Sequence, residues 1–211
     1  KLTYSGLNNM KKILFTGLLF TVPALSQAEV FDGGYLGGEL SFNKQSFSVP
    51  AKEIGYPEYH GNYTGSNSRS LGFGVLGGYA FNYGDNFVGI IEGKLSIPNN
   101  KVKDEEGEEI AKENFRVGLH YLQGYQIDNI LPYIKVGVEA GNFEMNESNS
   151  KFNRVSFENN NAFGFSYGFG VKVKMVNNLV AGLDYSRVTL KAKNEIEFKS
   201  NSIALNISYA F

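Results

Sequence analysis

The dominant pattern along the chain is strict alternation of large apolar residues with small or polar ones, and it is most regular in residues 201–211. One face of this segment, at period two, carries Ile203, Leu205, Ile207, Tyr209 and Phe211. The opposite face carries only Ser, Ala and Asn. Such alternation predicts an extended strand with one apolar and one polar face.

The same alternation recurs in seven further segments. Together with 201–211, the predicted strands are residues 34–43, 70–83, 87–97, 114–127, 131–141, 162–175 and 179–189. Tilted strands of about 10 residues match the hydrocarbon thickness of a bilayer. The pattern therefore predicts an all-β fold, an eight-stranded antiparallel up-and-down transmembrane β-barrel.

The connections between these strands alternate in length. Residues 84–86, 128–130 and 176–178 form short turns, whereas residues 44–69, 98–113, 142–161 and 191–200 form long loops. Short periplasmic turns at one end and long extracellular loops at the other are typical of outer-membrane barrels. A soluble up-and-down barrel shares the alternation but not this asymmetry.

Two features indicate that the apolar face points outward. The other face is crowded with Gly, Ala and Ser, which suit the narrow interior of an eight-stranded barrel. The aromatic residues also gather near the strand ends, as in the two girdles at bilayer interfaces. The turn end carries Phe81, Phe87, Tyr125, Tyr209 and Phe211, and the loop end carries Phe42, Phe73, Phe115 and Phe163. The alternative is a soluble barrel or sandwich with these aromatic residues in its core.

The start of the chain predicts export. Met10 is followed by two lysines, an apolar stretch over residues 13–25 and the small-residue exit Ser26-Gln27-Ala28. These are the three parts of a signal peptide in order. We predict a signal peptide at 10–28, cleaved after Ala28, and a barrel at 29–211. Residues 1–9 are interpreted as an over-extended start.

The composition excludes several classes of protein. Lys+Arg 20 against Asp+Glu 21 leaves no basic excess for nucleic acid. The chain has no cysteine for disulfides or for a cysteine metal site. No run of 18 apolar residues is present, which excludes transmembrane helices.

Charged residues nevertheless fall on the inward face. They are Glu39, Glu92, Lys94, Arg116, Lys135, Glu139, Lys172 and Asp184, joined by His120. Counting from the turns places Lys94, His120 and Glu139 just above a layer formed by the acids and lysines of the other strands. Unpaired charges in a narrow lumen would be costly, so we expect an ion-pair network that plugs the barrel at mid-height. The alternative is a small pore that opens when the charges exchange partners.

No catalytic constellation is evident. His60 lies in the first long loop, and His120 has no serine near it on its own face, as a hydrolase triad would require. The acidic run at 104–109 lacks the ligand spacing of a calcium loop. We therefore expect no catalytic residues, no metal, no cofactor and no enzyme activity.

Residues 33–38, 131–138 and 162–171, in this order and with the terminal aromatic strand, resemble the OmpA-like and OmpX-like eight-stranded outer-membrane barrels of Gram-negative bacteria, a family of surface antigens and porin-like proteins. The resemblance implies an outer-membrane location among lipid and lipopolysaccharide. It also implies that Ile207, Tyr209 and Phe211 form the insertion signal that the barrel-assembly machinery reads.

The function expected at this point is structural, or that of an adhesin or surface antigen. Residues 44–69 are rich in Tyr, Asn, Ser and Gly, a composition that suits adaptable contacts with host surface molecules. The alternative is a small-diameter, porin-like channel for ions or small solutes.

Overall fold

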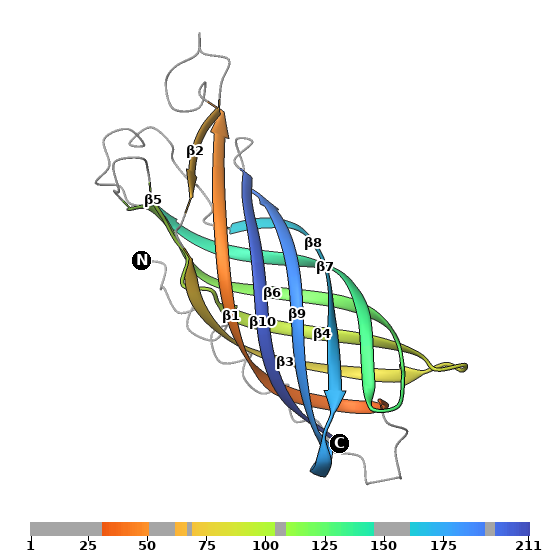
Figure 1. Cartoon of the computed structure of the whole chain (residues 1–211). Coiled ribbons are helices and arrows are strands. Elements are labelled where there is room, and N and C mark those ends of the chain that lie inside the picture. Colours follow the sequence, from red (N-terminus) through yellow and green to blue (C-terminus); the bar gives the residue numbers. More distant parts are fainter. Residues whose placement is uncertain (1–30, 51–61, 67–68, 104–108, 146–160, 193–196) are drawn as a thin grey trace, which may run out of the picture.

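The computed structural model describes residues 31–50, 62–66, 69–103, 109–145, 161–192 and 197–211. Its long strands run obliquely around one closed barrel (Figure 1). In chain order the wall consists of β1 (Gly33–Pro50), β3 (Ser70–Asn82), β4 (Phe87–Ile97), β6 (Glu109–Tyr125), β7 (Ile130–Met145), β8 (Asn161–Lys174), β9 (Leu179–Lys191) and β10 (Glu197–Ala210). Each strand pairs antiparallel with the next, and β10 pairs with β1. The predicted eight-stranded up-and-down barrel is confirmed.

Several predicted strand and loop limits were wrong on the loop side. β1 continues to Pro50, through the first part of the predicted loop 44–69, and stays in register with β10 from Lys44↔Asn201 to Ser48↔Glu197. β6, β7 and β10 likewise take in residues 109–113, 142–145 and 197–200, which we had placed in loops. Beyond the apolar surface, outward positions such as Lys44, Glu144 and Lys199 are polar, so apolar residues no longer mark the outer face of the strand, although backbone pairing persists.

Two short strands add to the sheet at this end. β2 (Asn62–Ser66) pairs with β1, and β5 (Lys101–Lys103) pairs with β6. The two meet at Ser66↔Lys103. The sheet above the ends of β3 and β4 is therefore completed by residues from two predicted loops, and Figure 1 shows β1 and β2 rising together beyond the barrel wall.

The three short turns lie where they were predicted, and their residue types explain their geometry. Positive φ values occur at Gly84, Asp85 and Asn86, at Asp128, and at Asn177 and Asn178. Gly, Asn and Asp tolerate this left-handed region, and hairpin turns that match the strand twist require it. Ile127 and Ile130 exchange both backbone hydrogen bonds, at 2.8 and 2.9 Å, and so close a two-residue turn.

The apolar face points outward, as predicted. Ile134, Phe165 and Ile207 are 63%, 76% and 64% exposed, whereas the neighbouring inward positions on the same strands are buried or half-buried. A surface of this kind would be unfavourable in water but suits acyl chains. Among the residues described, no helix is long and apolar enough to cross a membrane.

Candidate functional site

All nine residues predicted for the lumen lie inside the barrel. Eight of them are buried, and the side chain of Lys94 is 11% exposed. They project from six strands, β1, β4, β6, β7, β8 and β9, so only barrel closure brings them together. Each salt bridge among them joins residues on different strands.

Two ion pairs occupy the part of the lumen nearer the turns. Lys135 Nζ lies 2.6 Å from Asp184 Oδ1, and Lys172 Nζ lies 3.1 Å from Glu92 Oε2. The Tyr35 hydroxyl also donates to Glu92 Oε2 at 2.6 Å. The ammonium of Lys172 sits 4.8 Å from the centre of the Tyr35 ring, a cation–π distance. These charges are thus paired and hydrogen-bonded, as buried charges must be.

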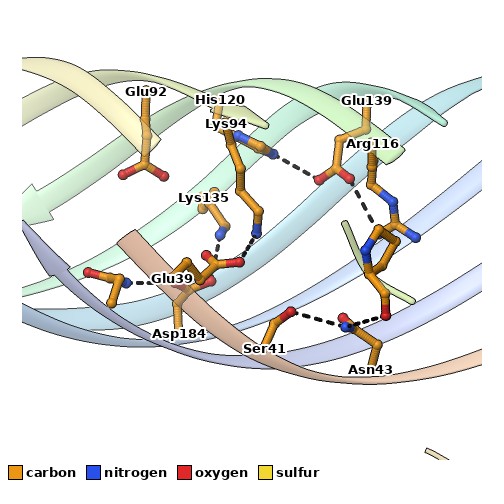
Figure 2. A network of polar contacts seen from close by, with 12 residues as sticks. Glu39, Ser41, Asn43, Glu92, Lys94, Arg116, His120, Lys135, Glu139 and Asp184 are labelled. Atoms are coloured by element: carbon orange, nitrogen blue, oxygen red, sulfur yellow. Dashed lines mark hydrogen bonds and ion pairs between the residues drawn. The ribbon is translucent and has the colours of Figure 1, made fainter. Parts of the chain in front are cut away.

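A second group lies nearer the loops (Figure 2). Lys94 Nζ contacts Glu39 Oε1 at 2.6 Å. Glu139 is shared, because His120 Nε2 lies 2.9 Å from its Oε1 and Arg116 Nη1 lies 3.5 Å from its Oε2. Counting from the turns had separated Glu39 from Lys94 by one layer. The tilt of the strands brings these two side chains to one height.

Glycine makes room for His120. A Cβ on Gly118 would lie 2.5 Å from His120 Cε1, and a Cβ on Gly137 would lie 2.4 Å from His120 Cδ2. The imidazole therefore lies across two glycines on β6 and β7. Such close approach explains why small residues crowd the inward face.

The sequence reasoning missed an apolar floor at the turn end of the lumen. Its buried residues are Phe31, Tyr35, Leu76, Ala80, Val88, Ile90, Leu122, Leu131, Tyr133 and Val180. The signal was available, because most of these residues lie on the inward register of the predicted strands close to the turns. A small cavity of about 20 Å³ lies at this floor, between Phe31, Tyr35 and Lys172, which is room for about one water molecule.

The second missed feature is a polar cluster at the loop end. Its centre is Glu113, which accepts hydrogen bonds from Arg116 Nε at 2.6 Å, from Asn100 Nδ2 at 2.8 Å and from Gln45 Nε2 at 3.0 Å. Asn100 is fully buried. Residues 98–100, which follow β4, are thereby held against the interior of the barrel mouth.

Two further contacts support this cover of the barrel mouth, which consists of residues 98–100 and the polar cluster around Glu113. Ser70 Oγ donates to the carbonyl of Pro98 at 3.0 Å, which holds residues 98–100 to the wall. Phe143 and Phe198 stack beside the cluster, with ring centres 4.1 Å apart. We had assigned Glu113, Pro98 and Phe198 to loops, so no inward face was read for them.

Other predicted features fall elsewhere. The signal peptide at 10–28, His60 and the acidic residues 104–108 lie outside the described residues. His120 bonds to Glu139 and, among the described residues, to no serine. In the same part of the chain, no three His, Cys, Asp or Glu side chains are grouped as metal ligands. Ile207, Tyr209 and Phe211 lie on the outer surface.

A closed β-barrel with an apolar exterior and a charged interior defines an integral membrane protein of the outer-membrane type. The family model for the outer membrane protein beta-barrel domain matches residues 13–211, and the chain belongs to this family. Family and fold together place the protein in the outer membrane.

Several solved structures are similar to the chain over most of their length. Neisserial surface protein A is 12% identical, with a TM-score of 0.53 over 85% of this chain and 97% of that one. OprG from Pseudomonas aeruginosa is 11% identical, with a TM-score of 0.45 over 86% and 96%. Ail, the attachment invasion locus protein of Yersinia pestis, is 14% identical, with a TM-score of 0.42 over 84% and 99%. No curated protein sequence matches the chain.

Proposed function

We propose that the protein is an outer-membrane barrel whose lumen is closed to ions and solutes, and that it acts structurally or as an adhesin or surface antigen through its extracellular end. We also propose that it has no enzyme activity. The observation that carries the closed lumen is that buried side chains occupy the barrel interior at three heights: the apolar floor, the ion pairs and the cluster around Glu113.

Each height opposes passage for a different physical reason. The apolar floor offers a passing ion no hydration. At mid-height the buried charges form salt bridges with one another. An ion that passed through would have to break salt bridges such as Lys135–Asp184. At the mouth, Glu113 binds Asn100, Arg116 and Gln45, and all four side chains are buried inside the barrel. An eight-stranded barrel has room for side chains and little else.

Planar-bilayer recording of the refolded protein tests the closed lumen. The bilayer should show no conductance steps above those of protein-free membranes at any voltage that the membrane withstands. A heat-modifiable band on gels from the same preparation establishes that the barrel is folded. Stable steps of porin size from such a preparation contradict the proposal.

A small-diameter channel is the second candidate, and one observation favours it. Arg116 contacts two carboxylates, Glu113 and Glu139, at 2.6 and 3.5 Å, so it can shift between partners without a large movement. A channel that works by such an exchange would show small, brief openings. Their frequency would change in an Arg116→Gln variant.

The surface role is supported by the loop end. β1, with 18 residues, and β6, with 17, are longer than a bilayer crossing requires, so they carry paired backbone out of the membrane. β2 and β5 widen this extension. The described ends of these strands therefore stand beyond the lipid surface, where host surface molecules can reach them.

Adhesion assays test this role with a non-adherent bacterial strain that expresses the full chain. Replacing residues 51–61 with a Gly-Ser linker of equal length should reduce attachment to cultured cells. A Gly-Ser linker of matching length in place of residues 104–108 controls for the effect of replacing a loop. If the strain that expresses the full chain attaches no better than the strain without the protein, the adhesin role is excluded and the structural role remains.

We propose further that residues 10–28 are a cleaved signal peptide. N-terminal sequencing of the protein from purified outer membranes should return Glu29 as the first residue. A chain that begins at Lys1 or Met10 would contradict this.

A further inference from the structure

Basic side chains gather on one side of the barrel exterior, directly above the apolar surface. The basic patch comprises Lys44 on β1 and Arg187 and Lys191 on β9, all exposed or half-exposed. β10 lies between these strands and contributes Lys199. Arg69 is also exposed and precedes Ser70, the residue that pairs with Asn43 of β1.

The strand register places these cations side by side. Asn201 of β10 pairs with Lys44 on one side and with Arg187 on the other. With about 4.8 Å between neighbouring strands, the backbones of Lys44 and Arg187 lie roughly 10 Å apart. Lys191 is one outward position further along β9 than Thr189, which pairs with Lys199. The cations thus form a compact group on three adjacent strands.

The boundary below the basic patch is abrupt. Two residues nearer the turns, the corresponding row is Phe42, Ile203 and Tyr185, paired across the same three strands. Phe42 and Ile203 are 50% and 53% exposed. Two residues of a strand rise only about 7 Å. Within that height the surface changes from apolar side chains to a row that contains Lys44 and Arg187.

In the part of the chain that the structure describes, one acid, Glu197, lies within the basic patch. Lys199 Nζ pairs with Glu197 Oε2 at 2.6 Å. Among the described residues, no salt bridge joins Lys44, Arg187 or Lys191 to an acid, although Glu197 is the register partner of Lys191. Cations held at the edge of an apolar surface are suited to an anion that occupies the same interface.

On the strands that follow β9 around the barrel, β8, β7 and β6, the apolar edge is neutral. Asn114 Nδ2 donates to Asn142 Oδ1 at 3.2 Å, and Asn142 Nδ2 donates to Asn161 Oδ1 at 2.9 Å. This amide ladder crosses β6, β7 and β8 just above Phe115 and Phe163. At the apolar edge itself, these three strands therefore carry no charge that would continue the basic patch.

We propose that the basic patch binds the phosphate groups of an anionic outer-leaflet lipid of the lipopolysaccharide type. The long-loop end of an outer-membrane barrel faces the exterior, so the patch stands at the outer head-group level. Arg and Lys form strong charge-assisted bonds with phosphate oxygens. The acyl chains of the same lipid lie along Phe42, Ile203 and Tyr185. The inference rests on the outer-membrane location and is independent of the closed lumen.

Lipid retention measured by native mass spectrometry tests the proposal. Folded wild-type protein in neutral detergent is titrated with diphosphoryl lipid A and, separately, with lipid A stripped of both phosphates. Wild type should retain the diphosphoryl form much more strongly. The variant Lys44→Gln/Arg187→Gln should retain it about tenfold more weakly, since each cation near a charged lipid surface contributes a severalfold factor.

The matched control is Lys112→Gln/Lys174→Gln, which removes the same charge outside the patch and should bind within twofold of wild type. Heat-modifiable gel mobility establishes that all variants are folded. Equal retention of both lipid A forms by wild type, or undiminished retention by the patch variant, would overturn the proposal. Conductance recorded from the same samples reports on the lumen separately.

Discussion

At the scale of single residues, the interior of this barrel depends on charges that are buried in pairs. Lys135 and Asp184 have side chains only 2% and 4% exposed, and their contact is 2.6 Å. Asp184 also accepts a hydrogen bond from Asn206 at 3.3 Å. A pair of this kind contributes little against an apolar substitute, but losing one partner leaves a buried charge uncompensated.

We therefore expect Lys135→Met to lower the free energy of unfolding by about 3–5 kcal/mol. The double variant Lys135→Met/Asp184→Leu should recover most of this loss, because no lone charge remains. Urea titrations in lipid vesicles, followed by heat-modifiable gel mobility, measure both values. Additive losses in the double variant would show that the two side chains do not act as a pair.

At the scale of elements, the turns set the register on which the barrel depends. A slip of one residue would exchange the inward and outward faces of a strand. The turn between β6 and β7 contains only Asp128 and Asn129, with Asp128 at φ 53°. A β-branched residue is strongly disfavoured in that region.

Asp128→Val should destabilise the barrel by about 1–2 kcal/mol, the cost of forcing a left-handed conformation. Asp128→Gly should fold like wild type, because glycine adopts this region freely. Vesicle unfolding titrations compare the two variants. A valine variant as stable as the glycine variant would mean that the turn can change type without cost.

The seam between β1 and β10 is completed by Phe211. Its backbone N–H donates to Gly34 at 2.8 Å, and its carbonyl accepts from Gly34 N–H at 3.2 Å. Its ring lies so close to Gly34 that a Cβ there would come within 2.7 Å of it. The proposed insertion signal thus occupies the last closing position of the barrel.

Phe211→Ser should slow barrel assembly in cells but not refolding of purified protein in detergent, if the assembly machinery reads this residue. Leu205→Ser removes comparable apolar surface from the same face of β10 and is the control. Pulse-chase labelling with gel mobility gives the cellular rate. Equal slowing by both variants would point to lost lipid contact in place of recognition.

At the scale of the whole molecule, the outward apolar surface makes the membrane part of the fold. Val138 lies near the middle of β7 and is 51% exposed, whereas Val176 lies in the turn before β9 and is 79% exposed. A bilayer distinguishes these two positions by depth, although water would not.

Arginine at position 138 should cost about 2–4 kcal/mol in vesicles, and arginine at position 176 about 0–1 kcal/mol, following the depth dependence of charge on a barrel exterior. The vesicle unfolding titration measures both variants. Equal costs at the two positions would place Val138 outside the hydrocarbon region and would shift the membrane boundary along the barrel.

The alternation of residue types was enough to predict the barrel, its eight strands, its turns and the direction of its apolar face. Each of these depends on neighbours along the chain. Residues 87–97 match β4 at both ends, because apolar alternation and turn residues there coincide with the paired backbone. The charges of the lumen were also found, since the inward register of a strand follows from its outward register.

Pairings between strands could not be read in this way. The chain showed that Glu39 and Lys94 face inward, but only strand tilt and closure decide that they meet. The cover over the mouth escaped prediction because Glu113 and Asn100 lie in segments where hydropathy carries no period. The basic patch needed the register of β1 against β10 and β9, strands from the two ends of the barrel sequence. Local sequence thus determined which way each side chain points, whereas the closed sheet decided which side chains touch.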